Sequence, residues 1–151
     1  MGQGYVVKCR NCDYEECVRL GVGMMYPQEY ADLVKGIKAG EYGDELREYF
    51  INNPGAVVDA QLELYYCPVC HNFEFEYNLS LYRHKQNKEL VNGYWIREYD
   101  NNEDYVFVKA YKHICSKCGN QMHKIKKSEF DNLVCPQCGQ PLEVTSEIMW
   151  D

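Results

Sequence analysis

Four Cys-x-x-Cys pairs constrain the fold of this 151-residue chain more than any other feature. Each pair is called a hook, and hooks 1 to 4 are, in chain order, Cys9 with Cys12, Cys67 with Cys70, Cys115 with Cys118, and Cys135 with Cys138. Two cysteines at this spacing bend readily around one metal ion but bridge poorly as a structural disulfide. Thiolates suit tetrahedral Zn²⁺, so the hooks predict two four-cysteine zinc sites with these eight cysteines as ligands.

The spacing between hooks favours sequential pairing. Sixteen residues separate hook 3 from hook 4, a typical spacing for one zinc site, and Gly119 and Gly139 follow these hooks. Hooks 1 and 2 then pair across 54 residues, because closing a long loop costs little more than closing a short one. Asp13 and His71, which tolerate left-handed backbone, replace glycine there. Nested and crossed pairings remain as alternatives, and either would tie the chain ends together.

Two helices are expected between hooks 1 and 2. Pro27 suits the first residue of a helix, and Gly40 is a plausible stop. Apolar residues recur at helical spacing between them, at Tyr30, Leu33, Val34 and Ile37. A second, shorter helix is expected from Asp44 to just before Pro54. The two helices form an insertion, at about residues 27–53, inside the unit that carries hooks 1 and 2.

Short strands are expected around every hook. Residues 4–20 read as two strands flanking hook 1, and the alternating residues 57–66 predict a half-buried strand that leads into hook 2. Hook 2 would then be the tip of a hairpin. A separate hairpin is predicted from residues 94–99 and 105–111, with its turn at residues 100–104. Strands are also expected at residues 122–125 and 142–145, after hooks 3 and 4.

The hooks resemble those of a known family. Cys115-x-x-Cys118-Gly119 and Cys135-Pro136-x-Cys138-Gly139 look like the two knuckles of zinc ribbons, over roughly residues 113–145. A split unit at residues 5–20 and 62–77 shares the likeness. The opening Tyr5-Val-Val-Lys-Cys-Arg-Asn-Cys-Asp-Tyr14 is similar to that of rubredoxins, which bind iron with four thiolates and carry glycine where this chain has Asp13. The whole chain resembles bacterial double zinc-ribbon proteins. The resemblance implies metal binding and no particular activity.

The fold class that follows is a small α+β fold. It comprises two zinc-ribbon β-hairpin units, the first of which contains the two-helix insertion. We expect the first unit at residues 1–82, a polar linker at residues 83–92, and the second hairpin and ribbon at residues 93–151.

A cytoplasmic protein is expected. The N-terminal residues lack the apolar run of a signal peptide, and no segment reaches the roughly 18 apolar residues of a membrane span. A membrane partner is therefore not expected. Cys17 lies outside the hooks and is expected to be a small packing residue, with a reactive thiol or a fifth ligand as the alternative.

Four thiolates close a zinc site, whereas a catalytic zinc needs an open position, so catalysis is not expected. The four histidines form no metal-binding pattern; they are His71, His84, His113 and His123. The leading hypothesis is a structural protein with two zinc ions that serves as an interaction module. The alternative is an iron-containing electron carrier of the rubredoxin type.

The charge distribution bears on the partner. The net charge is −7, which disfavours a general attraction to nucleic acid, and a protein partner is expected. Residues 109–127 nevertheless carry six lysines and no acidic residue: Lys109, Lys112, Lys117, Lys124, Lys126 and Lys127. This basic patch makes nucleic-acid binding a third hypothesis. The simpler interpretation is that the lysines offset the charge of the thiolates.

Overall fold

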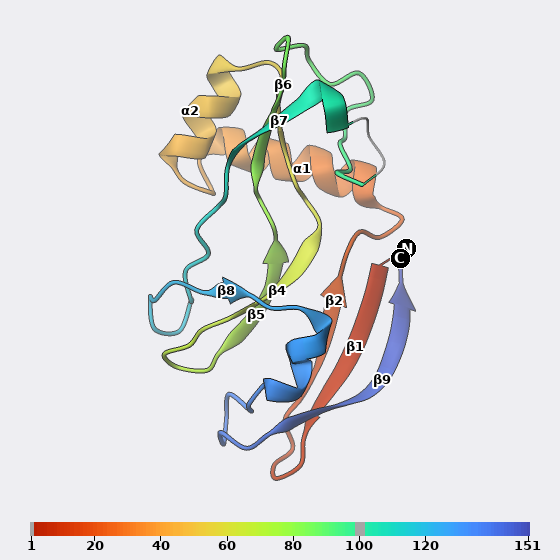
Figure 1. The fold of residues 1–151 in the computed structure, drawn as a ribbon, viewed down its shortest axis with the longest axis vertical. Coiled ribbons are helices and arrows are strands. Elements are labelled where there is room, and N and C mark those ends of the chain that lie inside the picture. Colours follow the sequence, from red (N-terminus) through yellow and green to blue (C-terminus); the bar gives the residue numbers. More distant parts are fainter. Residues whose placement is uncertain (1, 99–101) are drawn as a thin grey trace. The chain divides into compact units, whose positions relative to one another are not determined.

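Three antiparallel sheets and two helices make up the part of the chain that the structure describes (Figure 1). The structure is a computed structural model, and it describes residues 2–98 and 102–151. Each sheet has three strands. The chain is therefore a small α+β protein, as the sequence predicts.

The chain divides into two compact units, each built from segments far apart in the sequence. Unit 1 comprises the residues up to Gly23, Leu62–Tyr77 and Lys112–Asp151, and unit 2 comprises Met24–Gln61 and Asn78–Tyr111. All four hooks lie in unit 1. This division differs from the expected one at residues 1–82, 83–92 and 93–151, because the first and last of these segments each contribute to both units.

The first sheet of unit 1 joins the two ends of the chain. Its strand order is β2-β1-β9, with β1 at Gly2–Cys9, β2 at Glu15–Leu20 and β9 at Leu142–Trp150. Strand β1 pairs with β9 from Gly2 opposite Trp150 to Cys9 opposite Leu142, with a bulge between Val6 and Val7. The N- and C-termini consequently lie side by side (Figure 1).

The second sheet of unit 1 is built around hook 2. Its order is β5-β4-β8, with β4 at Leu62–Tyr66, β5 at Phe73–Tyr77 and the short β8 at His123–Lys124. As expected, hooks 1 and 2 are the tips of hairpins, β1–β2 and β4–β5. A backbone bridge between Gly21 and Leu62, with N–O distances of 2.8 Å both ways, links the two sheets.

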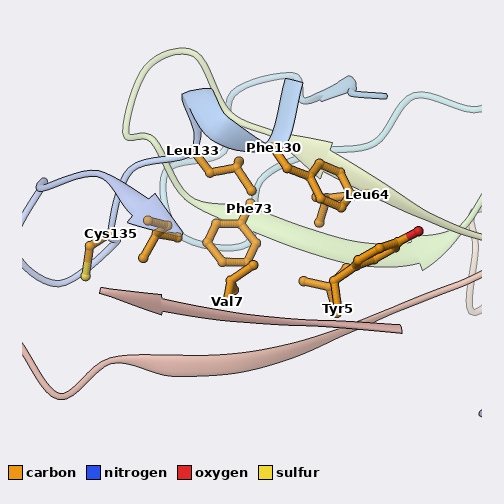
Figure 2. Close-up of a cluster of buried hydrophobic side chains, with 9 residues drawn as sticks. Tyr5, Val7, Leu64, Phe73, Phe130, Leu133 and Cys135 are labelled. Atoms are coloured by element: carbon orange, nitrogen blue, oxygen red, sulfur yellow. The ribbon is translucent and has the colours of Figure 1, made fainter. Parts of the chain in front are cut away.

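One apolar cluster receives side chains from both sheets and from the 3₁₀ helix η2 (Lys127–Asn132) (Figure 2). Its buried members are Tyr5, Val7, Val18, Leu64, Phe73, Phe130, Leu133, Cys135 and Leu142. The Phe130 ring meets the Tyr5 ring edge to face, with the centroids 5.4 Å apart. Burial of each large apolar side chain contributes about 1.5–3 kcal/mol, so this cluster is the main core of unit 1.

Unit 2 contains both helices and the third sheet. Helix α1 is Tyr26–Ala39 and helix α2 is Asp44–Asn52, so both predicted helices are confirmed to within a residue or two. Gly40 ends α1 in the left-handed conformation, at φ 90°. The sheet order is β3-β6-β7, with β3 at Ala56–Val58, β6 at Leu81–His84 and β7 at Tyr105–Lys109.

The single strand predicted at residues 57–66 is wrong. It is broken into β3 and β4, which belong to different units. The break occurs at Asp59, whose carboxylate accepts a hydrogen bond from the Gln61 amide at 3.1 Å, and whose own amide donates to the Ser80 carbonyl at 2.9 Å. Such a local side-chain bond competes with the strand ladder. The alternation of residue types therefore predicted strand structure but missed the turn.

The hairpin predicted from residues 94–99 and 105–111 is also wrong. Strand β7 pairs with β6 instead, and residues 94–98 form no strand. The reason is Trp95, which is fully buried in unit 2 and whose ring packs on those of Tyr82 and Tyr105, with centroids 4.8 and 5.4 Å away. Of the predicted turn, residues 100 and 101 lie outside the described residues, and Asn102–Asp104 form the 3₁₀ helix η1.

Residues 83–92, expected as a linker, lie within unit 2. The His84 amide donates to the Gly55 carbonyl at 2.9 Å, and the Gly55 amide donates to the Asn87 side-chain oxygen at 3.1 Å. These bonds tie the segment to the turn that precedes β3. A polar composition therefore marks a surface loop here, and the chain crosses between units at other points.

Candidate metal centres

The backbone turns in a similar way at all four hooks. The amide of each first cysteine donates to the carbonyl five residues later, at 2.7 to 2.9 Å; the acceptors are Tyr14, Asn72, Asn120 and Gln140. In hooks 2 to 4 the residue after the second cysteine is left-handed, with φ 63° at His71, 76° at Gly119 and 75° at Gly139. Glycine reaches this region without strain, whereas His71 adopts it as a non-glycine residue.

The hooks meet in two groups of four cysteines, with nested pairing. The outer site consists of hooks 1 and 4, that is Cys9, Cys12, Cys135 and Cys138. The inner site consists of hooks 2 and 3, that is Cys67, Cys70, Cys115 and Cys118. The predicted sequential pairing, in which Cys9 and Cys12 join Cys67 and Cys70, is therefore wrong. The eight predicted residues do gather into two groups of four.

Strand pairing explains the nested arrangement. Strand β9 follows hook 4 and lies against β1, which leads into hook 1, so hooks 1 and 4 end at the same edge of one sheet. Strand β8 follows hook 3 and lies against β4, which leads into hook 2. Pairing between the strands thus decides which hooks meet.

The two sites are built on the same backbone plan in the same register. Lys8, just before hook 1, faces Glu15 and Glu143 on its two neighbouring strands. Tyr66, just before hook 2, faces Phe73 and His123. Glu15 and Phe73 each stand six positions after the first cysteine of their own hairpin. Glu143 and His123 each stand eight positions after the first cysteine of hook 4 and hook 3, respectively. The structure therefore contains the same arrangement of a hairpin and a third strand twice, although the residues between the hooks show no sequence repeat.

Hydrogen bonds around hooks 3 and 4 repeat as well. The Met122 amide donates to the His113 carbonyl at 2.8 Å, and the Leu142 amide donates to the Leu133 carbonyl at 3.0 Å. Isolated bridges flank both hooks, from Ile114 to Gln121 and from Val134 to Pro141. The backbone around hook 3 in the inner site therefore matches the backbone around hook 4 in the outer site.

The sulfur positions fit a tetrahedral metal ion. Within each site all four sulfurs lie within 4.8 Å of one another. The closest pairs are Cys9–Cys138 at 3.4 Å, Cys12–Cys135 at 3.6 Å, Cys67–Cys118 at 3.4 Å and Cys70–Cys115 at 3.5 Å. A zinc ion bound at about 2.3 Å separates its sulfurs by about 3.8 Å. All nine cysteines are free thiols. Both sites could therefore hold a metal ion with four soft ligands.

Amide groups point at several of the sulfurs. Backbone amides of Asn11 and Gln137 lie 3.3 and 3.4 Å from the sulfurs of Cys9 and Cys135. In the inner site the Asn120 side-chain amide lies 3.3 Å from the Cys118 sulfur. Such donors stabilise thiolate charge and orient the ligands. The Asn72 side-chain amide lies 3.8 Å from the Cys115 sulfur, and the pattern Cys-x-Asn, which ends at Asn72 after hook 2 and at Asn120 after hook 3, is the sequence signal for these two side-chain donors.

Within each site the thiols differ in acidity. The pKa of Cys118 is lowered to about 6, chiefly because the Asn120 side chain donates a hydrogen bond to its sulfur. The pKa of Cys138 is lowered to about 7, chiefly through a hydrogen bond with the Gln140 backbone.

The opposite shift affects Cys12 and Cys70. A backbone hydrogen bond lowers the pKa of each, with Tyr14 and Asn72 respectively, but burial and the neighbouring thiols outweigh it and raise the pKa to about 12. Four thiols this close share their protons rather than ionising together. A divalent cation is what would let all four become thiolates.

The remaining candidate residues lie outside both cysteine groups. Cys17 is half-buried opposite Val6 in the β1–β2 pair and belongs to neither group, so the fifth-ligand alternative finds no support. Among the described residues no histidine joins a cysteine group either. His113, two residues before hook 3, is buried, with its Nδ1 2.9 Å from the Glu76 carboxylate and its ring stacked 3.7 Å from that of Tyr65.

The basic patch at residues 109–127 is divided between the units, with Lys109 in unit 2 and the other five lysines in unit 1. Three of the six lysines form ion pairs, Lys109 with Glu45 at 2.5 Å, Lys124 with Glu63 at 2.6 Å and Lys127 with Glu147 at 2.7 Å. Lys127 also lies over the Tyr5 ring, 4.8 Å from its centroid. Much of the positive charge is thus already balanced within the chain.

No helix in the described part of the chain is long and apolar enough to cross a membrane. Comparisons with protein-family models, curated proteins and solved structures give no match to this chain. The sites must therefore be interpreted from their own geometry.

Proposed function

We propose that this chain is a structural zinc-binding protein that serves as an interaction module, with one Zn²⁺ in the outer site and one in the inner site. The observation that carries the proposal is the convergence of eight thiols into two groups whose sulfurs lie 3.4 to 3.6 Å apart at their closest. The arrangement of strands that recurs around the two sites supports the assignment of each site as a zinc ribbon.

Zinc is preferred to iron on chemical grounds. A tetrahedral site of four thiolates accepts either metal, but the affinity of such a site for divalent ions is higher for Zn²⁺ than for Fe²⁺. An electron carrier of the rubredoxin type is the alternative, and it rests on the same four-sulfur geometry. Metal identity separates the two functions.

A structural role follows from the ligand set. Four thiolates fill the coordination sphere of zinc and leave no position for water or substrate. Bound zinc stabilises finger-type folds by on the order of 10 kcal/mol, a large contribution for a unit with one modest core. We therefore propose that zinc holds the fold and that the protein acts by binding.

A protein is the proposed partner. The net charge is −7, and binding of two Zn²⁺ by eight thiolates would leave each site at about −2. Three of the six lysines in the patch at residues 109–127 are engaged in ion pairs. These charges favour a protein partner over nucleic acid, whose binding requires lysines free to meet phosphates.

Elemental analysis together with a visible spectrum of the purified, untagged protein tests this function. Two zinc ions per chain and a colourless solution are expected. A red protein with iron that is reduced and reoxidised reversibly would favour the electron carrier instead. A protein that holds no metal, and takes up none when reduced and supplied with Zn²⁺, would overturn the proposal.

A further inference from the structure

The two sites share a backbone plan but are held together differently. The position two residues before the first cysteine of the later hook is His113 in the inner site and Leu133 in the outer site. The position directly after that cysteine is Ser116 in the inner site and Pro136 in the outer site. The inner site is polar at both positions, and the outer site is not.

The outer site rests on the main core of unit 1. Cys135, Leu133 and Leu142 all belong to the large apolar cluster, and Figure 2 shows Leu133 next to Phe73, with Cys135 at the edge of the group. Strand β9, which follows hook 4, pairs with β1 along its whole length from Cys9 back to Gly2. Hook 4 is therefore fixed to hook 1 by burial and strand pairing, in addition to any metal ion that the two hooks would share.

The inner site has much less support of this kind. Its apolar cluster has only four buried members, Tyr65, Cys67, Cys115 and Met122, and two of these are candidate ligands. Strand β8, which follows hook 3, pairs with β4 at two positions only. Segments with little apolar burial and short ladders open locally at low free-energy cost.

Hydrogen bonds to the carboxylates of Glu74 and Glu76, called the polar latch, partly compensate for the small apolar cluster and the short β8 pairing. The Glu74 carboxylate on β5 accepts hydrogen bonds from the Ser116 amide at 3.0 Å, the Ser116 hydroxyl at 2.5 Å and the Asn72 side chain at 2.8 Å. The neighbouring Glu76 bonds to His113 at 2.9 Å. Because β5 leads out of hook 2, these two carboxylates clamp hook 3 onto hook 2 from outside the sulfur cluster.

We propose that the inner site is an exchange site for thiolate-preferring divalent cations and that Glu74 is its positioning residue, while the outer site retains its metal. The inference rests on the proposed zinc-binding function. A metal leaves such a site as its thiolates detach one after another and take up protons. In the inner site the detached cysteines of hook 3 would be held near hook 2 only by the two-residue pairing of β8 with β4, the Ile125 to Leu64 backbone bond and the bonds to Glu74 and Glu76. In the outer site Cys135 belongs to the main core, and Cys9 and Cys12 pack against it, so three of the four cysteines stay in place when a thiolate detaches.

Metal release to a chromogenic chelator in excess tests this inference on the full-length protein loaded with two Zn²⁺. Two phases of equal amplitude are expected, a fast phase from the inner site and a slow phase from the outer site. Cys70→Ser should abolish the fast phase, and Cys12→Ser should abolish the slow phase. A single phase for both metals, or slow release from the inner site, would overturn the exchange site but leave the zinc-binding function intact.

The latch is tested in the same assay. Glu74→Ala should accelerate the fast phase on the order of tenfold, as expected for loss of a group that orients a ligand, and leave the slow phase unchanged. Glu74→Gln should restore most of the wild-type rate, because its amide oxygen accepts the same bonds from Ser116. The matched control is Glu16→Ala, at the equivalent position on β2, which should alter neither the fast phase nor its amplitude. A fast phase indifferent to Glu74→Ala would refute the positioning role.

Discussion

Cysteines of one site differ in pKa because the hydrogen-bond donors and the burial around their sulfurs differ. The Cys118 sulfur accepts a hydrogen bond from the Asn120 side-chain amide, which lowers its pKa to about 6. Cys70 in the same site has a pKa raised to about 12. Reactivity toward alkylating agents follows the thiolate, not the thiol. Without metal, Cys118 should therefore react faster than Cys70, and Cys138, whose pKa is lowered to about 7, faster than Cys12, whose pKa is raised to about 12.

For reduced protein freshly stripped of metal at pH 7, under conditions in which circular dichroism shows that it is still folded, limiting iodoacetamide should label Cys118 and Cys138 before Cys12 and Cys70. Peptide mass spectrometry reads the order of labelling. Asn120→Leu removes the side-chain donor and should slow labelling of Cys118 while that of Cys138 is unchanged. Labelling of Cys70 as fast as Cys118 would contradict the assigned hydrogen bonds.

At the residue scale the sequence predicts the candidate ligands well and their neighbours poorly. The Cys-x-x-Cys spacing identifies all eight cysteines, because two sulfurs can converge on one metal from so short a turn. The left-handed residue after the hook was anticipated at Gly119, Gly139 and His71. Glu74 gave no signal, since its role depends on Ser116, 42 positions away along the chain.

Glycines on β1 leave room for large side chains of β9 to approach its backbone closely. Gly4 faces Ile148, and a Cβ atom at Gly4 would lie 2.6 Å from Cγ1 of Ile148. Gly2 similarly faces Trp150, whose indole nitrogen donates to the carbonyls of Gln3 and Leu20. The glycines thus let large side chains of β9 lie flat on the sheet.

Gly4→Ala should therefore lower the free energy of unfolding by about 1–2 kcal/mol, since overpacking forces Ile148 from its position. Combined with Ile148→Ala, the same substitution should cost little or even stabilise the strand, because the clash is gone. Urea denaturation of the zinc-loaded protein measures all four members of the cycle. Additive effects of the two substitutions would show that the close approach contributes nothing to stability.

At the element scale the sequence predicts what local chemistry decides. Both helices were predicted because their apolar spacing, Pro27 and Gly40 are local signals, and the hook hairpins were predicted from short alternating runs. The failures at residues 57–66 and 94–111 have tertiary causes. Asp59 turns the chain between two units, and Trp95 is drawn into the core of unit 2, which no local pattern reveals.

At the scale of the whole molecule, the two candidate metal sites are nested, because hooks 2 and 3 meet within the stretch of chain that hooks 1 and 4 close. Spacing alone misleads here, because closing the 44 residues between hooks 2 and 3 costs only about 1 kcal/mol more than closing the 16 residues between hooks 3 and 4. Pairing of β1 with β9, together with the buried cluster beneath it, outweighs such a difference. Hooks 1 and 4, with the pairing of β1 and β9, consequently join the two ends of the chain. Hooks 2 and 3, with the pairing of β4 and β8, join two segments that lie between those ends in the sequence.

Protection of cysteines in single-site variants tests the nested pairing most directly. For zinc-loaded Cys12→Ser, treated with N-ethylmaleimide under native conditions and mapped by mass spectrometry, the nested order predicts labelling of Cys9, Cys135 and Cys138. The four inner cysteines should be labelled more slowly than these three, at a rate limited by zinc release from the inner site. The mirror variant, Cys70→Ser, should expose Cys67, Cys115 and Cys118 and no other cysteine of the four hooks. If Cys12→Ser instead exposes Cys67 and Cys70 while Cys135 and Cys138 stay protected, the hooks pair sequentially and the nested arrangement is wrong.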